Sequence, residues 1–455
     1  MASQIIHFIV GIILARILSP MEFGLIGMIT IFIAVSQSLV DSGFQQALIR
    51  KQDADNTDFS TVFYFNFALG LLFYIILFFS ARPISRFYDE VQLTEIIRVF
   101  GLVIVINSLA LIQRARLIKA INFKLQTKIS ILSSSISGAV GIYMAYNGYG
   151  VWSLVWRTVV NQLFQAVLLW LFNRWKPGLI FSLNSLKQMF SFGSKLLISG
   201  LLDTLYKNIN LLVIGKFFSA GELGFYSRAD QFQKLPSANI TATVQRVSYP
   251  VLTKVQDESA RLKEGYRKII NSTMFISFTS MLTLVAIAKP MILTLIGEKW
   301  LPSVTMLQLL CIAGMLSPLH AINLNMLKVK GRADLFLKLE IIKKVLAIPV
   351  IILGIIFGVT VMIAGMVFNS FLAYFLNSYY SGRLINYSVK EQIIDILPSF
   401  LIALSSGTVL FIPTLIFNSH FPLMLFIQII SGIVLIASLS ELTKNRAYQI
   451  GRAHV

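Results

Sequence analysis

The sequence predicts an all-α polytopic membrane bundle of about fourteen transmembrane helices. Two parallel six-helix lobes are expected around a central cavity, followed by two extra C-terminal helices. Three observations predict this class: an apolar composition, apolar runs long enough to cross a bilayer, and an internal repeat. Of 455 residues, 56% are hydrophobic and 13% are charged, whereas a soluble domain has roughly 25% charged residues. This much apolar surface requires lipid as its solvent.

The apolar runs set the expected helices. About 20 apolar residues cross a bilayer as one helix, and short polar breaks separate fourteen such runs along this chain. The runs that we expect to be helical lie near 2–18, 23–45, 60–80, 95–115, 125–146, 150–172, 190–214, 222–248, 268–288, 302–325, 335–357, 359–382, 394–417 and 421–440. Because every connection between them is short, no separate soluble domain fits into the chain.

The basic residues predict the orientation of the bundle. With alternate sides assigned to successive loops, one side carries 23 Lys and Arg residues and the other carries five. Loops rich in Lys and Arg stay on the cytoplasmic side of a membrane. We therefore expect a multi-pass protein of the bacterial inner membrane with both termini in the cytoplasm. The net charge of +19 is explained by these loops, so nucleic-acid binding is not expected.

An internal repeat with an offset of 200 residues divides the chain. The matched positions are Arg16 with Lys216, Ser19 with Ser219, Glu22 with Glu222, and Gly24 with Gly224. At an offset of 208, Asn161 matches Asn369. Six spans separate the copies, and an even number inserts both halves in the same orientation, which is an arrangement found in transporters.

The repeat predicts the domain boundaries. We expect an N-terminal lobe at 1–187, a C-terminal lobe at 188–390, and two further helices at 391–445. The chain starts inside an apolar run, so we expect the first helix to be truncated. Residues 446–455 form a tail, and its last six residues, 450–455, resemble translated sequencing-adapter read-through. We therefore expect this tail to be partly artefactual.

Three of the expected helices carry polar side chains on one face when successive residues are placed 100° apart. An ionisable residue inside a span costs roughly 2.5–3.5 kcal/mol, so such a face is expected to meet a partner or a water-filled cavity. Amides suit hydroxyl-rich ligands, and cationic side chains suit phosphate. The expected substrate cavity is lined by Gln37, Gln45, Lys207, Asn210, Arg228, Gln231, Asn239 and Arg246. Asp41 and Asp203 are candidates for binding a proton or a cation.

Other residues on these helices have a structural alternative. Asp203 and Lys207 are four residues apart, as are Asp230 and Lys234, so each acid can pair with its lysine along one helix. Such pairs either line a cavity or hold helices together. Pro236 removes a backbone hydrogen bond and should bend its helix, either as a hinge or as a static kink.

Several kinds of site are not expected. Cys311 is the single cysteine, which excludes an intramolecular disulfide and a cysteine metal cluster. The four histidines (His7, His320, His420 and His454) show no metal-ligand spacing. No G-x-x-x-x-G-K-[ST] segment occurs, so an ATP-driven pump is excluded. We expect no cofactor.

One segment is specific enough to indicate a family. Residues 223–236, followed by 239–241 and 247–252, resemble the polysaccharide flippases of the Wzx type, and above all their WzxC-like branch. Residues 23–25, 40–43 and 47–49 add to this resemblance, which extends from residue 2 to about residue 445. These flippases belong to the MOP superfamily, together with the multidrug exporters called MATE and the lipid II flippase MurJ.

The resemblance implies a two-lobed transporter that works by alternating access. Its implied substrate is an oligosaccharide on undecaprenyl diphosphate, flipped from the cytoplasmic to the periplasmic leaflet for O-antigen, capsule or exopolysaccharide synthesis. The implied partners are this lipid-linked oligosaccharide, membrane lipids, and polysaccharide polymerase and export machinery. The resemblance implies that the cavity lies at the first helices of each lobe. It does not imply a role for any individual residue.

Two alternatives from the sequence remain. An ion-coupled multidrug or cation exporter of the same superfamily would share the fold and the polar faces. A membrane enzyme, such as a sugar polymerase or ligase, would need a large periplasmic loop with catalytic side chains. The outer loops of this chain are short, so we do not expect an enzyme.

Overall fold

The fold is helical throughout the part of the chain that the structure describes. The computed structural model describes residues 2–41, 43–416, 420–443 and 448, which form helices α1 to α17 and one 3-10 turn, η1. The described residues contain no strand, which confirms the expected all-α class. Packing groups the chain into two compact units, Met1–Gly224 and Phe225–Val455. The expected lobes at 1–187 and 188–390 and the expected extra helices at 391–445 divide the chain differently and remain a prediction.

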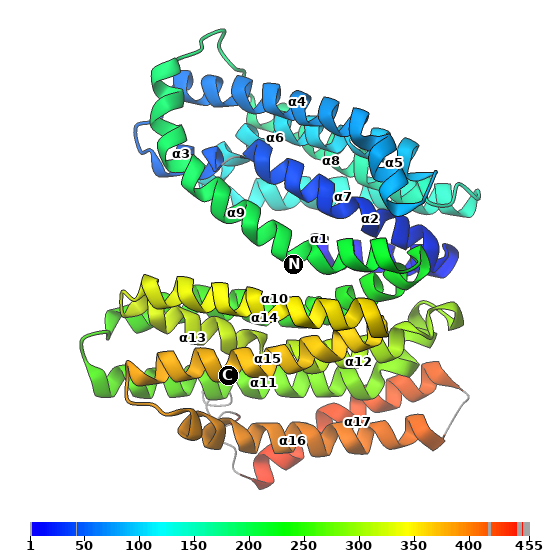
Figure 1. Ribbon diagram of the computed structural model, residues 1–455, viewed down its shortest axis with the longest axis vertical. Helices are drawn as coiled ribbons and strands as arrows, with labels where there is room; N and C mark the ends of the chain where they lie inside the picture. Colours follow the sequence, from blue (N-terminus) through cyan, green and yellow to red (C-terminus); the bar gives the residue numbers. More distant parts are fainter. Residues whose placement is uncertain (1, 42, 417–419, 444–447, 449–455) are drawn as a thin grey trace. The chain divides into compact units, whose positions relative to one another are not determined.

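The first unit is a bundle of long helices, coloured from blue to green in Figure 1. Helix α1 packs on α7, α7 on α8, α6 on both α4 and α8, and α9 on α2. The helices are α1 (Ala2–Ile17), α2 (Pro20–Asp41), α3 (Phe44–Arg50), α4 (Asn56–Tyr88), α5 (Leu93–Phe100), α6 (Leu102–Lys119), α7 (Phe123–Tyr146), α8 (Trp152–Asn173), α9 (Leu183–Phe217) and the start of α10 (Ala220–Lys254).

The repeated segments begin their helices in the same way. The Ser19 backbone N–H donates to the Glu22 carboxylate at 2.6 Å, just before α2. The Ser219 backbone N–H donates to the Glu222 carboxylate at 3.2 Å, and the Glu222 backbone N–H donates to the Ser219 hydroxyl at 3.1 Å. Such caps satisfy backbone N–H groups that have no partner in the first turn of a helix. The serine and glutamate recur because both copies need this cap.

The same repeat brings the starts of α2 and α10 into backbone contact. A Cβ atom on Gly24 would lie 1.7 Å from the carbonyl oxygen of Ala220, and one on Gly224 would lie 1.9 Å from that of Pro20. The two contacts are reciprocal, since Gly24 lies against the backbone of Ala220 and Gly224 lies against the backbone of Pro20. Only glycine permits such an approach, which explains why both glycines recur.

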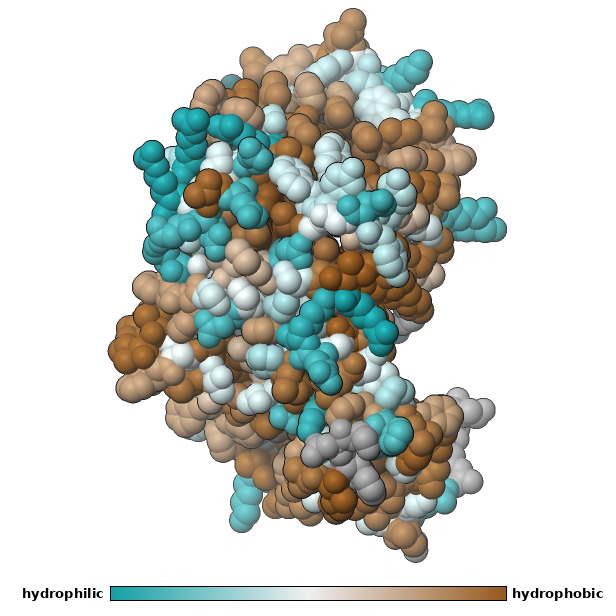
Figure 2. Space-filling view, turned by 90° about the vertical axis from the view of Figure 1, so that its right-hand side faces the viewer, coloured by the Kyte–Doolittle hydropathy of each residue, from teal (hydrophilic) through white to brown (hydrophobic). Residues whose placement is uncertain are grey.

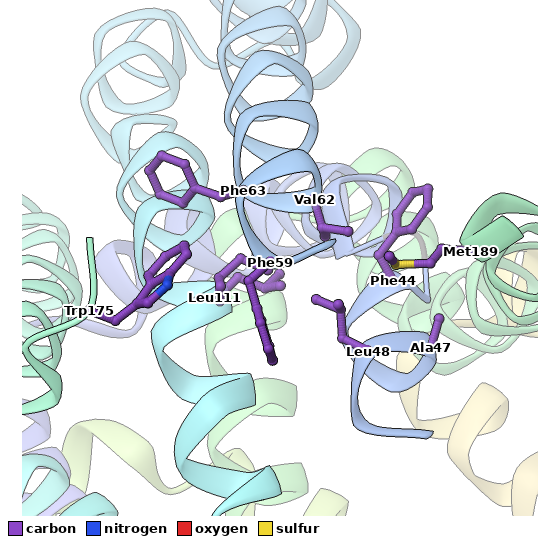
Figure 3. Close-up of a cluster of buried hydrophobic side chains, with 10 residues drawn as sticks. Phe44, Ala47, Leu48, Phe59, Val62, Phe63, Leu111, Trp175 and Met189 are labelled. Atoms are coloured by element: carbon purple, nitrogen blue, oxygen red, sulfur yellow. The ribbon is translucent and has the colours of Figure 1, made fainter. Parts of the chain in front are cut away.

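A cluster of buried hydrophobic side chains packs several helices of the first unit together (Figure 3). Its members come from α3, α4, α6, the segment between α8 and α9, and α9: Phe44, Ala47, Leu48, Phe59, Val62, Phe63, Leu111, Ile112, Trp175 and Met189. The indole N–H of Trp175 donates to Asn56 at 2.7 Å, and its carbonyl accepts from the Gln113 amide at 3.0 Å. The polar edges of this buried residue are therefore satisfied.

The second unit is built around α11 (Ser259–Leu295), coloured light green in Figure 1. Helix α11 packs against α12, α16 and α17, while α14 packs on α15, and α15 on α12. The remaining elements are η1 (Glu298–Trp300), α12 (Ser303–Gly314), α13 (Ser317–Val329), α14 (Ala333–Phe357), α15 (Val359–Arg383), α16 (Val389–Ile416) and α17 (Phe421–Leu442). The expected tail at 446–455 lies outside the described residues, apart from Tyr448.

Length and hydropathy make this a multi-pass membrane protein. Among the described residues, eleven helical segments are long and apolar enough to cross a membrane. The other three expected spans correspond to α1, α10 and α14, of which α1 is short and the other two carry several charges. Apolar side chains cover much of the face in Figure 2. On α17 they form an exposed stripe at helical spacing: Leu423, Phe426, Ile427, Ile430, Ile433 and Val434. Such a stripe suits contact with lipid.

Three expected spans are interrupted, and two prolines are accommodated. The span 23–45 divides into α2 and α3 at Gly43, where φ is 70°. The span 95–115 divides into α5 and α6 at Gly101, and 302–325 divides into α12 and α13 after Gly314. Helix α10 continues through both Pro236 and Pro250 to Lys254. The hinge role of Pro236 stays a prediction.

Candidate functional site

The polar face expected on α10 is accessible. Gln231, Asn239 and Arg246 are exposed, and Arg228 is half-buried. On another face of the helix, Lys234 pairs with Asp230 at 2.7 Å, and the Asp230 side chain is only 18% exposed. The charge of this half-buried acid is therefore neutralised within the helix. The assignment of the first face to a substrate cavity remains a prediction.

Helix α9 presents its ion pair on an accessible face. The Lys207 ammonium lies 2.6 Å from the Asp203 carboxylate, as predicted, with the side chains 69% and 56% exposed. The pair is therefore not covered by neighbouring helices of the first unit, and the choice between lining a cavity and holding helices together stays a prediction. Asn210, two turns after Asp203, is half-buried. The substrate and ion roles of these residues stay predictions.

The polar face expected on α2 does not continue as one helical line. Gln37 is half-buried on α2, and Asp41 is its last residue. Gln45 lies on α3, beyond the left-handed turn at Gly43, so the 100° spacing does not carry across to it. Instead, the Gln45 backbone N–H bonds to the Asp41 carboxylate. The Oδ1 atom of Asp41 is buried without a hydrogen-bond partner.

A half-buried polar network starts near Asp41 and was not anticipated from the sequence. The Arg114 guanidinium on α6 lies close enough to Asp41 to attract it electrostatically. Arg114 donates to the Gln165 carbonyl at 3.3 Å, and the Gln165 amide donates to the Asn161 carbonyl at 3.0 Å. Asn161 donates to the Ser137 hydroxyl at 3.0 Å. This chain of bonds connects α6, α8 and α7.

A second set of bonds ties α1 to the same two helices. The Arg157 guanidinium on α8 lies 3.2 Å from the His7 Nδ1 atom and 3.3 Å from the His7 carbonyl oxygen. The other ring nitrogen of His7 lies 3.0 Å from the Ser134 hydroxyl on α7. Arg157, Asn161 and Gln165 are spaced four residues apart on one face of α8, and this spacing was the signal available in the sequence.

Part of the first network lines a cavity of about 240 Å³ within the first unit. Arg114 and Gln165 reach it from α6 and α8, and Gln126 and Ser130 reach it from α7. The lining is therefore hydroxyl- and amide-rich with one guanidinium. Groups of this kind bind hydroxyls and anions.

The second unit has its own buried hydrogen-bond cluster. The Tyr266 hydroxyl on α11 donates to the Asn323 carbonyl on α13. Asn323 donates to the Ser378 hydroxyl at 3.1 Å and accepts from the Ser381 hydroxyl at 2.8 Å, both on α15. These side chains are fully buried, so the cluster joins three helices and is not a binding surface. Among the described residues, no three His, Cys, Asp or Glu side chains gather as metal ligands would.

A model of a protein family matches more than half of the chain. The family model described as "Polysaccharide biosynthesis protein" matches residues 13–305. Teichuronic acid biosynthesis protein TuaB of Bacillus subtilis (strain 168) is 32% identical over 302 residues, which are 66% of this chain and 62% of TuaB. Lipopolysaccharide biosynthesis protein WzxC of Escherichia coli (strain K12) is 27% identical over 348 residues, which are 75% of this chain and 70% of WzxC.

Comparison with solved structures identifies the fold. The structure titled lipid II flippase MurJ, inward closed conformation, superposes with a TM-score of 0.77 at 15% sequence identity. The superposition covers 97% of this chain and 98% of that structure. The two chains therefore share a fold.

Proposed function

Because the chain belongs to the polysaccharide biosynthesis protein family, we propose that it flips an oligosaccharide on undecaprenyl diphosphate from the cytoplasmic to the periplasmic leaflet by alternating access. The product would serve surface polysaccharide synthesis, as O-antigen, capsule or exopolysaccharide. The family match over residues 13–305 carries this proposal. The names of TuaB and WzxC, which refer to polymers of the cell surface, support it.

The charge of the substrate explains what the protein must supply. A diphosphate cannot cross hydrocarbon unaided, because burying charge without a partner is very costly. The proposed carrier lowers this barrier with accessible cationic and amide side chains between lipid-facing helices. Lys207, Arg228 and Arg246 would bind phosphate, and Gln37, Gln45, Asn210, Gln231 and Asn239 would bind sugar hydroxyls. Asp41 and Asp203 stay candidates for ion coupling, and Pro236 for the hinge.

The setting of this transporter is also proposed. It lies in the bacterial inner membrane with both termini in the cytoplasm, as the distribution of Lys and Arg favours. It performs no chemical reaction on the sugar. A polysaccharide polymerase and export machinery would act on the oligosaccharide after it reaches the periplasmic leaflet.

Reconstitution tests the proposal directly. The protein is placed in liposomes with a fluorescent oligosaccharide on undecaprenyl diphosphate, and a membrane-impermeant quencher reports the fraction in the outer leaflet. Vesicles with protein should exchange the lipid between leaflets, while protein-free vesicles should not. Transport of cationic dyes without movement of the lipid-linked sugar would show the exporter alternative to be right.

Replacement of Arg228 with Ala tests the proposed cavity on α10. A charge-assisted hydrogen bond contributes roughly 1.5–3 kcal/mol, so flipping in the liposome assay should slow by about tenfold or more. Arg261→Ala is the matched control, since Arg261 makes a 2.9 Å surface pair with Glu258 and should flip at the wild-type rate. An Arg228→Ala protein that inserts normally and flips at the wild-type rate would remove Arg228 from the site.

A further inference from the structure

The connection between α8 and α9 exposes apolar side chains next to basic ones. Residues 174–190 lead from the end of α8 into the first turns of α9 (Figure 1). Leu179, Ile180 and Phe181 follow one another with 97%, 52% and 49% of their surface exposed. A run of three exposed apolar residues is unfavourable in water and indicates a function. None of these residues belongs to the proposed substrate site.

Hydrogen bonds from α4 hold the backbone of this connection in place. The Gly178 N–H donates to the Ser60 hydroxyl at 2.9 Å, and the Ser182 N–H donates to the Thr61 hydroxyl at 3.0 Å. Both hydroxyl side chains are fully buried. The three exposed apolar residues lie between these two bonded positions. The fixed backbone therefore presents them on the surface of the first unit.

The two ends of the connection pack into the hydrophobic cluster of the first unit. Trp175 and Met189 are both members of that cluster and are labelled in Figure 3. Helix α9 thus begins with Met189 buried, while Leu183 and Phe190 are exposed. These two residues are seven apart and lie on one face of the helix. The first turns of α9 therefore extend the exposed apolar surface of the connection.

This apolar surface lies where two spans end. Helix α8, which ends at Asn173, and helix α4, which begins at Asn56, are both long and apolar enough to cross a membrane. The Trp175 indole, just after α8, donates to Asn56 at 2.7 Å, so the two span ends are neighbours. The connection therefore lies at the boundary between hydrocarbon and water. At this boundary, apolar side chains can enter the leaflet while basic side chains reach the headgroups.

The charges of the connection are positive. Three exposed cations lie along it: Arg174, Lys176 and Lys187. The sequence contains no Asp or Glu between residues 174 and 202. Asp58, in the first turn of α4, is buried and pairs with Lys51 at 2.6 Å, so it does not neutralise these cations. Basic side chains beside an apolar surface are complementary to a bilayer that contains anionic phospholipid.

We propose that residues 174–190 form a membrane-surface anchor that binds anionic phospholipid. Leu179, Ile180 and Phe181 enter the leaflet, and the three exposed cations bind the phosphates of anionic headgroups. On the proposed orientation this is the cytoplasmic leaflet. Because α9 begins within the anchor, lipid binding fixes the depth at which this helix starts. The inference goes beyond the proposed function, since the anchor would bind lipid whether or not the protein moves sugar.

A fluorescent probe on the anchor tests whether it enters lipid. The full chain with Leu179→Cys is labelled with an environment-sensitive fluorophore and placed in nanodiscs, while Cys311 is buried and should not react. Lipids with a nitroxide high on the acyl chain should quench this probe, and iodide in the water should not. Asp257→Cys is the matched control, because Asp257 is exposed between α10 and α11 with polar neighbours. Its probe should be quenched by iodide and not by the lipid.

Removal of two cations tests the preference for anionic lipid. Nanodiscs with phosphatidylglycerol should quench the probe at position 179 more than nanodiscs of phosphatidylcholine alone. Each cation near an anionic surface strengthens binding by about fivefold, so Lys176→Gln with Lys187→Gln should remove most of this difference. Lys254→Gln with Lys390→Gln is the matched control, because it removes the same charge from exposed positions of the second unit. This control should keep the difference.

The outcomes are distinct. Equal quenching by iodide at positions 179 and 257 would place the connection in water and overturn the proposal. Equal quenching by lipid with and without phosphatidylglycerol, or the same response in both double variants, would overturn the binding of anionic headgroups. A probe that iodide reaches in nanodiscs but not in native membranes would assign this surface to a protein partner and would also contradict a lipid anchor.

Discussion

At the scale of single residues, the sequence located polar side chains within the spans but not their partners. The pairs Asp203–Lys207 and Asp230–Lys234 could be predicted because both members lie on one helix. The bonds from Arg157 to His7 and from Arg114 to Gln165 join helices that are far apart in sequence. Which faces of two helices meet depends on packing of the whole unit, and no local spacing encodes it.

Arg157 gives a prediction at this scale. Replacing it with Leu should lower the free energy of unfolding by roughly 1–3 kcal/mol, because the half-buried acceptors on His7 would lose their donor. Thermal unfolding in detergent, followed by circular dichroism, measures the change. Arg82→Leu is the control, since Arg82 is exposed on α4 and surface substitutions usually stay within about 0.5 kcal/mol. Equal melting temperatures for the two variants would show that Arg157 contributes nothing to stability.

At the scale of helices, each of the fourteen expected apolar runs corresponds to one or two helices of the structure, but hydropathy did not predict where helices break. The hydropathy of an apolar run is the same whether the run forms one straight helix or two shorter ones. Helices α5 and α6, which meet at Gly101, are an example. The Tyr74 ring lies 3.2 Å from where a Gly101 Cβ would be, so a neighbouring helix constrains this position. The repeated serine and glutamate were better predictors, because a cap is built from neighbours in the chain.

The glycine crossing of α2 and α10 makes a prediction about these two elements. Gly24→Val should prevent the two helix starts from meeting, since even its Cβ would overlap the Ala220 carbonyl at 1.7 Å. We expect poor yield of folded protein, or a melting temperature lower by many degrees. Gly224→Val should behave alike, through Pro20. Gly200→Ala serves as the control, because the nearest atom to its Cβ would be 3.8 Å away. A stable Gly24→Val protein would exclude a close backbone contact at this crossing.

At the scale of the whole molecule, two different criteria divide the chain. The repeat predicts a boundary between residues 187 and 188 because it marks which segments correspond. Packing places α9 with the first unit, which ends at Gly224, because α9 lies along α2 and α4. The repeat shows which segments of the two halves correspond, but it does not show which helices pack together. The boundary predicted from the repeat and the boundary found from packing therefore describe different properties of the chain. The order of the helices along the chain is common to both.

Orientation in the membrane is a prediction for the whole molecule, and α8 offers a compact test of it. Tyr149 precedes this helix, Lys176 follows it, and both are exposed, so a cysteine at either position lies at an opposite end of one span. Cys311 is buried and should not react. Because Lys- and Arg-rich loops remain in the cytoplasm, an impermeant maleimide added to intact cells should label Tyr149→Cys, and should label Lys176→Cys only after permeabilisation. The reverse pattern would place the basic loops outside, so the lipid-linked sugar would have to enter the carrier from the side opposite to the one proposed.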